Sequence, residues 1–200
     1  MKMRDTKGFT LIELLIVVAI IGIIAAIAVP GLLRARMSGN EASAIGSMRA
    51  VNSAESTYAS SCANGNYATF LADLILPPNG SNAGFVSPDL DPAVNAATAL
   101  GGGSDAVSKS GYTVELGQGT VSTPPGQAPC NAAPNVPLPT YFAAATPNAL
   151  GSTGQRSFGT DSRATIYQDT NATSAPGAPY TFDKNTVSSA PNGLTQSPIQ

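Results

Sequence analysis

The chain has 200 residues, of which 11% are charged, with 12 acidic side chains against 10 basic ones and a formal net charge of −2. That balance excludes the basic surface that is typical of nucleic-acid-binding proteins, so we expect no nucleic-acid partner. The chain contains no histidine, which removes the commonest general base, the commonest zinc ligand and every nucleophile activated by histidine. We therefore expect no catalytic residues, no cofactor and no metal site.

A short basic leader, residues 1–8, precedes an apolar run at residues 9–29 that is interrupted only by Thr10, Glu13 and Gly22. As a helix, these 21 residues would be about 31 Å long, which is enough to cross the hydrocarbon core of a bilayer. A secretory signal peptide is the alternative, because residues 26–28 (Ala-Ile-Ala) offer a small-residue cleavage pattern at the end of the run.

Glu13 argues against the signal peptide. An unpaired carboxylate inside an apolar segment is costly and therefore usually functional, and a signal peptide gains nothing from it. Residues 7–13 (Lys-Gly-Phe-Thr-Leu-Ile-Glu), followed by the apolar residues 14–18, resemble the class III signal of type IV pilins and of type II secretion pseudopilins. The resemblance covers the leader and the first helix, about a quarter of the chain.

This resemblance implies how the chain is processed and where it acts. A prepilin peptidase would cut between Gly8 and Phe9 on the cytoplasmic side, Phe9 would be N-methylated, and the apolar helix would stay with the mature protein. The implied partners are further copies of the chain, the peptidase, an inner-membrane platform protein, an assembly ATPase, and membrane lipid before assembly. The subunit would cross the inner membrane once with its head outside the cytoplasm, then enter an extracellular pilus or a periplasmic filament.

The new amine on Phe9 gives Glu13 a physical role. Glu13 lies four residues further on, hence on the same helical face one turn away. In an isolated subunit the two charges would partly neutralise each other; in a filament the carboxylate would accept the amine of a neighbouring copy and so fix the axial register. Gly22 weakens the helix interior and Pro30 removes a hydrogen bond, so the helix between them either unwinds locally in the filament or merely kinks.

The rest of the chain divides into a second helical half and a head. Residues 30–61 are expected to continue the helix as an amphipathic half, because Leu33, Met37, Ala44, Ile45, Met48, Val51 and Tyr58 recur at spacings near three and four. Residues 62–200 form the predicted head, which is rich in loops and ends in a partly ordered tail at 170–200.

The predicted fold class is α+β: a long N-terminal helix packed against a small antiparallel sheet. One short helical face is expected at residues 67–74 and a helical turn at 92–100. Strands are expected at 112–116, 140–145 and 163–167, with residues 154–161 forming a turn before the last strand.

Cys62 and Cys130 both fall in the head. Export to an oxidising compartment would permit a disulfide between them; two buried, reduced thiols are the alternative. Asp89 and Asp91 are the nearest approach to a cation site, but their spacing lacks a calcium-loop pattern, and we interpret them as solvated loop carboxylates.

Three functions remain. The first is a structural subunit that polymerises through its N-terminal helix into a type IV pilus or a similar filament. This class includes the pseudopilins of type II secretion systems, which the sequence does not distinguish from pilins. The second is a minor tip pilin that acts as an adhesion or binding module, and the third is a membrane-anchored exported enzyme that would have to work without histidine. The low charge and many small residues of the predicted head suit dense packing, which favours the first.

Overall fold

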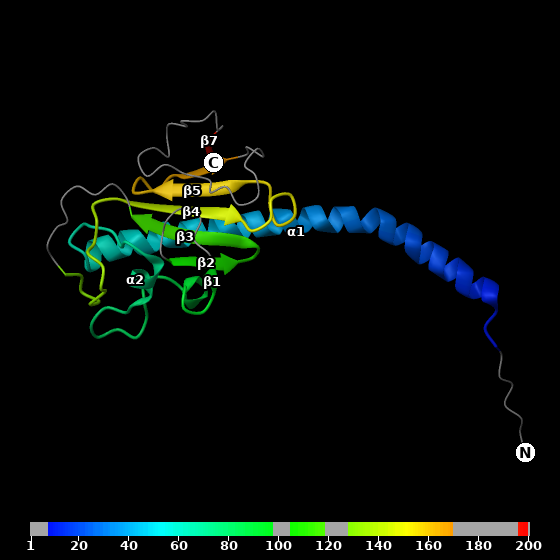
Figure 1. The fold of residues 1–200 in the computed structure, drawn as a ribbon, viewed down its shortest axis with the longest axis horizontal. Helices are drawn as coiled ribbons and strands as arrows, with labels where there is room; N and C mark the ends of the chain where they lie inside the picture. Colours follow the sequence, from blue (N-terminus) through cyan, green and yellow to red (C-terminus); the bar gives the residue numbers. More distant parts are fainter. Residues whose placement is uncertain (1–7, 98–104, 119–127, 170–195, 200) are drawn as a thin grey trace, which may run out of the picture. The chain divides into compact units, whose positions relative to one another are not determined.

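The structure, a computed structural model, describes residues 8–97, 105–118, 128–169 and 196–199. The chain divides into two compact units, Met1–Arg36 and Met37–Gln200. One long helix, α1 (Leu11–Ser61), contributes to both units (Figure 1). It ends at the predicted place, where Asn64 and Gly65 adopt positive φ angles of 51° and 86° and the Gly65 amide donates to the carbonyl of Ala59 at 2.8 Å.

The part of α1 in the second unit is amphipathic, as the spacing of its apolar residues predicts. Ala44, Met48, Val51, Ala54 and Tyr58 are buried in the core, because residues three and four apart line one helical face. The predicted stripe begins too early, however. Leu33 belongs to the first unit and is exposed.

Within the described residues, the head contains a seven-stranded sheet in the order β1 to β7, and each strand runs antiparallel to its neighbours. Figure 1 shows the central strands beside the head portion of α1. The longest pairing aligns Tyr112 with Pro147 and Gln118 with Tyr141. The strands are β1 (Ala96–Ala97), β2 (Asp105–Lys109), β3 (Tyr112–Gln118), β4 (Tyr141–Pro147), β5 (Ser157–Asp161), β6 (Ile166–Asp169) and β7 (Gln196–Pro198). The predicted α+β fold class, a long helix against a small antiparallel sheet, is thus confirmed.

Two of the three predicted strands correspond to β3 and β4. The third is displaced, because residues 163–165 belong to the turn between β5 and β6. Residues 154–161 were expected to be a turn, yet 157–161 form β5. The sequence Ser-Phe-Gly-Thr-Asp has weak strand preference by itself, and β5 is held by pairing with β4 on one side and β6 on the other.

Smaller elements complete the head. Helix α2 (Leu71–Ile75) overlaps the short helical face predicted at 67–74 but begins four residues later, and a 3₁₀ turn, η1, covers Pro88–Leu90. The prediction of a helical turn at 92–100 is wrong for residues 92–97, which form turns and then β1. Residues 98–100 lie outside the described residues. Residues 170–195 and 200 of the predicted tail also lie outside the described residues. The described part of the tail contains β7, which pairs with β6.

The core lies between α1, α2 and one face of the sheet. Tyr58 packs edge-on against Phe85, with ring centroids 5.2 Å apart. Cys62 and Cys130 form a disulfide, as predicted, and the Cys130 amide donates to the Cys62 carbonyl at 3.1 Å. The end of α1 is therefore joined covalently to the segment that leads into β4.

Candidate assembly site at the N-terminal helix

The predicted processing residues, Gly8 and Phe9, lie just before α1 and outside it. Both are exposed, and the Phe9 ring retains 83% of its accessible surface. The helix starts two residues after Phe9, at Leu11. The peptide bond between Gly8 and Phe9 therefore lies outside the helix between two exposed residues, where a protease can reach it more readily than a helical bond.

Glu13 is held by Thr10, the residue that precedes the helix. One oxygen of its carboxylate accepts the Thr10 amide at 2.9 Å and the Thr10 hydroxyl at 2.7 Å. The Glu13 amide donates back to the Thr10 hydroxyl at 3.3 Å. This reciprocal arrangement is a capping box, which satisfies amides that the first turn of a helix leaves without partners. The Thr-x-x-Glu pattern before an apolar run signals such a cap, and our sequence analysis did not use it.

Exposed apolar side chains cover the helix that follows. Every residue from Gly8 to Arg36 is exposed, and within the described residues α1 is the one helix long and apolar enough to span a membrane. Removing such side chains from water is worth about 1.5–3 kcal/mol each, so this surface requires lipid or protein around it. The sixteen large ones are Phe9, Leu11, Ile12, Leu14, Leu15, Ile16, Val17, Val18, Ile20, Ile21, Ile23, Ile24, Ile27, Val29, Leu32 and Leu33.

Gly22 and Pro30 both lie inside the helix, which is continuous through them in the subunit. A side chain added at Gly22 would meet no atom within 4 Å. Nothing within the described part of the subunit therefore demands glycine at this position.

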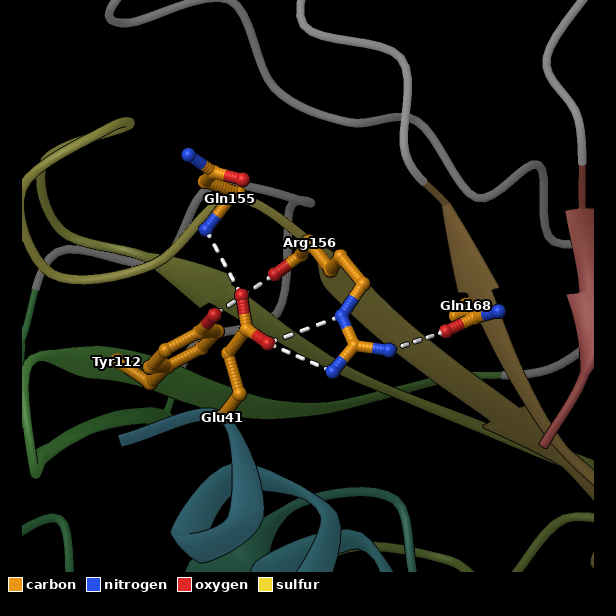
Figure 2. Close-up of polar contacts among 5 residues, drawn as sticks. All are labelled: Glu41, Tyr112, Gln155, Arg156 and Gln168. Atoms are coloured by element: carbon orange, nitrogen blue, oxygen red, sulfur yellow. Dashed lines mark hydrogen bonds and ion pairs between the residues drawn. The ribbon is translucent and has the colours of Figure 1, made fainter. Parts of the chain in front are cut away.

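A second polar site joins α1 to the sheet within the head unit (Figure 2). The Glu41 carboxylate accepts the Arg156 guanidinium at 2.9 and 2.6 Å through one oxygen, and the amide of Gln155 at 3.0 Å through the other. Arg156 also donates to the side-chain oxygen of Gln168 at 2.7 Å, while its carbonyl accepts the Tyr112 hydroxyl at 2.8 Å. We call these five residues the Glu41 clamp.

Asn52 makes another connection of the same kind. Its side-chain oxygen accepts the hydroxyls of Tyr141 and Thr160, at 2.8 and 3.1 Å, and its amide nitrogen donates to the carbonyl of Ala164 at 3.1 Å. Neither Asn52 nor Glu41 could be recognised as important from the sequence. Their partners lie 89 to 115 positions away, and no local pattern reveals such pairs.

The acidic loop residues do not form a metal site in the described part of the chain, where no group of three possible ligands occurs. Asp89 forms an ion pair with Lys109 and accepts the Ser87 hydroxyl. Asp161 accepts the Arg163 guanidinium at 2.6 and 2.8 Å. These two carboxylates are thus engaged by cations of the chain itself.

Comparison with known families matches residues 3–29 to the family described as "Prokaryotic N-terminal methylation motif". The match covers the exposed start of α1 and most of its apolar segment. Over 39 residues this chain is 64% identical to "Type IV wide pilus major component PilA4" of Thermus thermophilus. The aligned region covers 20% of this chain and 30% of that protein.

Over 76 residues this chain is 37% identical to "Type IV major pilin protein PilA" of Myxococcus xanthus. The aligned region covers 38% of this chain and 34% of that protein. The resemblance to type IV pilins is therefore confirmed, although the matches span about a third of each relative's length. No solved structure matches the chain.

Proposed function

We propose that this chain is a structural subunit that polymerises through its N-terminal helix into a type IV pilus. The observation that carries the proposal is the exposed apolar surface from Phe9 to Leu33, most of which lies within the residues that match the methylation motif, 3–29. A surface of this size needs a continuous apolar environment, and a bundle of identical helices supplies one after the bilayer is left. The subunit contributes packing surface and performs no catalysis.

Processing would precede assembly. A prepilin peptidase cuts between Gly8 and Phe9 on the cytoplasmic side, and Phe9 is then N-methylated. The match at residues 3–29 supports this step, as does the accessible chain around the bond. The new subunit then spans the inner membrane once, with its head outside the cytoplasm, until a platform protein and an assembly ATPase drive its extraction into the fibre.

The contacts of Glu13 suggest how register is selected. Before cleavage its carboxylate is oriented by the amide and hydroxyl of Thr10, at the end of the helix where a negative charge is favourable. Cleavage places the Phe9 amine one residue before Thr10. In the fibre, Glu13 accepts the Phe9 amine of a neighbouring copy, so that only one axial offset leaves no charge unpaired. Unwinding between Gly22 and Pro30 adjusts the helix to that packing.

A pilin is preferred to a pseudopilin because the two curated relatives reported above carry the names of major pilus components. No contact in the described head points to a tip-binding role. The fibre would then consist mainly of this chain and lie at the cell surface.

Shearing cells and analysing the released fibres tests the proposal. We expect this chain to dominate the fibres and to begin with a methylated Phe9. Glu13→Gln should be cleaved normally but yield few fibres, because the charge that selects register is gone. Thr10→Ser keeps the hydroxyl and serves as the matched control. A secreted protein that starts after Ala28 would contradict the proposal, because no helix would remain to polymerise.

A further inference from the structure

Arg34 and Arg36 are the first charged residues after Glu13. Between them and Glu13 lie twenty uncharged residues, 14–33. From Leu11 to Leu33 the helix is about 34 Å long at a rise of about 1.5 Å per residue, close to the roughly 30 Å of hydrocarbon in a bilayer. A subunit that spans the membrane therefore brings both arginines to the level where hydrocarbon gives way to lipid headgroups.

Both arginine side chains are available at that level. They are exposed, and among the described residues neither takes part in an ion pair or a side-chain hydrogen bond. Glu13, the sole described carboxylate of the first unit, is engaged by Thr10 at the other end of the apolar run. Among the described residues of their own unit, the two guanidinium groups consequently have no acidic partner.

Their positions on the helix widen their reach. Residues two apart on an α-helix differ by about 200° around its axis, so Arg34 and Arg36 extend to different sides. Long basic side chains at the end of a span keep their stems on apolar surface and extend the charge into the interface. The guanidinium fork matches two oxygens of a phosphate, which an ammonium does not.

We propose that Arg34 and Arg36 bind phosphodiester groups of phospholipids at the outer end of the span and set its depth in the membrane. This inference depends on the proposed function, since it requires the helix to span a bilayer before assembly. It adds a lipid site that must be vacated when the subunit is extracted. Basic residues near membrane spans are usually more frequent on the cytoplasmic side, so two arginines at the outer end of the span are unfavourably placed. A local anionic partner such as a lipid phosphate offsets this cost.

The processed chain, reconstituted in phosphatidylcholine–phosphatidylglycerol vesicles in phosphate-free buffer, provides the test. Solid-state NMR measures dipolar coupling between lipid ³¹P and ¹³C-labelled arginine Cζ. We expect coupling in the natural chain, its loss in Arg34→Lys/Arg36→Lys, and its retention in Arg49→Lys, an exposed arginine further along α1. Unchanged coupling in the double variant, or none in the natural chain, would overturn the proposal.

Depth is measured by a spin label at Gly31→Cys, where an added side chain meets nothing within 4 Å. In Arg34→Gln/Arg36→Gln the label should move inward by up to one helical turn, about 5 Å, while Arg49→Gln leaves it in place. Unchanged depth combined with reduced fibre yield would assign the arginines to a neighbouring protein copy and overturn the lipid site.

Two further results separate the possible failures. Equal coupling to inorganic phosphate in maltoside micelles would show a general phosphate contact and overturn the assignment to lipid. If the spin label stays fully accessible to an aqueous nickel chelate in vesicles, the helix does not span, and the membrane stage of the proposed function fails with this inference. Insertion without ³¹P coupling defeats the lipid site alone and leaves the proposed function standing.

Discussion

The Glu41 carboxylate on α1 accepts hydrogen bonds from the Arg156 guanidinium, which lies just before β5, although the two residues are 115 positions apart in the chain. The side chain of Glu41 is 11% exposed and that of Arg156 is 38% exposed. The guanidinium carbon also lies 5.6 Å from the centre of the Phe158 ring. This pair fastens the head part of α1 to the strand that sequence analysis misread as a turn.

Glu41→Gln should therefore destabilise the head. The substitution leaves Arg156 partly buried without its counter-charge, and breaking such a hydrogen-bonded pair costs about 1–3 kcal/mol after allowance for the exposed side of the guanidinium. Denaturant unfolding of the processed chain in detergent measures the change. Arg163→Gln is the matched control, because the Arg163 guanidinium is exposed and its pair with Asp161 should contribute less than the Glu41–Arg156 pair. Equal losses in the two variants would refute a special role for the clamp.

Glu55 predicts an unusual pH dependence. It is fully buried; one oxygen accepts the Ala68 amide at 2.9 Å, and the other has no partner among the described atoms. Burial raises the pKa of Glu55 well above its ordinary value, and the nearby Asp73 raises it further. Burial also raises the pKa values of Asp73, Tyr58 and Tyr141, and no described ion pair brings a cation to either carboxylate.

A raised pKa in the folded state means that the folded head binds the proton more tightly than the unfolded chain does. The stabilisation from Glu55 is thus complete below the unfolded pKa and is lost as pH rises through the folded one. In Glu55→Gln the part of the decline that Glu55 causes should disappear, and the variant should be more stable than the natural chain at alkaline pH, because the amide oxygen still accepts from Ala68. Thermal unfolding across pH measures it; an unchanged decline in the variant would refute the assignment.

Asp89 serves as a control, because its contribution to stability should depend on pH in the opposite direction. Hydrogen bonds from Lys109 and Ser87 lower its pKa, so its contribution is present above the unfolded pKa and is lost as pH falls through the folded one. Since the Asp89 side chain is half exposed, Asp89→Asn should change the pH profile only slightly.

The disulfide should stabilise the head by restricting its unfolded state. Cys62 and Cys130 are 68 positions apart, and a bridge that closes a loop of this size contributes about 2–4 kcal/mol. Cys62→Ser/Cys130→Ser should lower the free energy of unfolding by that amount, measured by denaturant titration. Reductant should lower the stability of the natural chain by a similar amount and leave the double variant unaffected; a response of the double variant would point to another cause.

The sequence was most informative where structure is local. The apolar run, the spacing of Met48, Val51 and Tyr58, and the turn after Ser61 are each encoded within a few residues, so α1 and its end could be predicted. Strand β5 and the Glu41 clamp could not, because pairing partners far along the chain determine them. The cap formed by Thr10 had a local signal and was recoverable. The register proposed for Glu13 depends on a neighbouring copy, which one chain's sequence does not describe.

Two glycines should respond oppositely to alanine. A side chain at Gly84 would collide with the backbone carbonyl of Ile75, where the chain runs close to α2 and Phe85 donates to the Leu74 carbonyl at 2.8 Å. Gly84→Ala should therefore destabilise the head by about 1–3 kcal/mol. Gly46 lies on the exposed side of α1, where an added methyl group meets nothing within 4 Å.

Because alanine is the better helix former, Gly46→Ala should stabilise the isolated subunit by about 0.5–1 kcal/mol. Unfolding measurements on both variants under the same conditions should show these opposite changes in the free energy of unfolding. The fibre yield of Gly46→Ala then distinguishes two reasons for the glycine at this position. A normal fibre yield would mean that the glycine only weakens the helix. A more stable subunit that assembles poorly would mean that a neighbouring copy packs against the bare backbone. Destabilisation of the isolated subunit by this substitution would contradict the helix geometry described for α1.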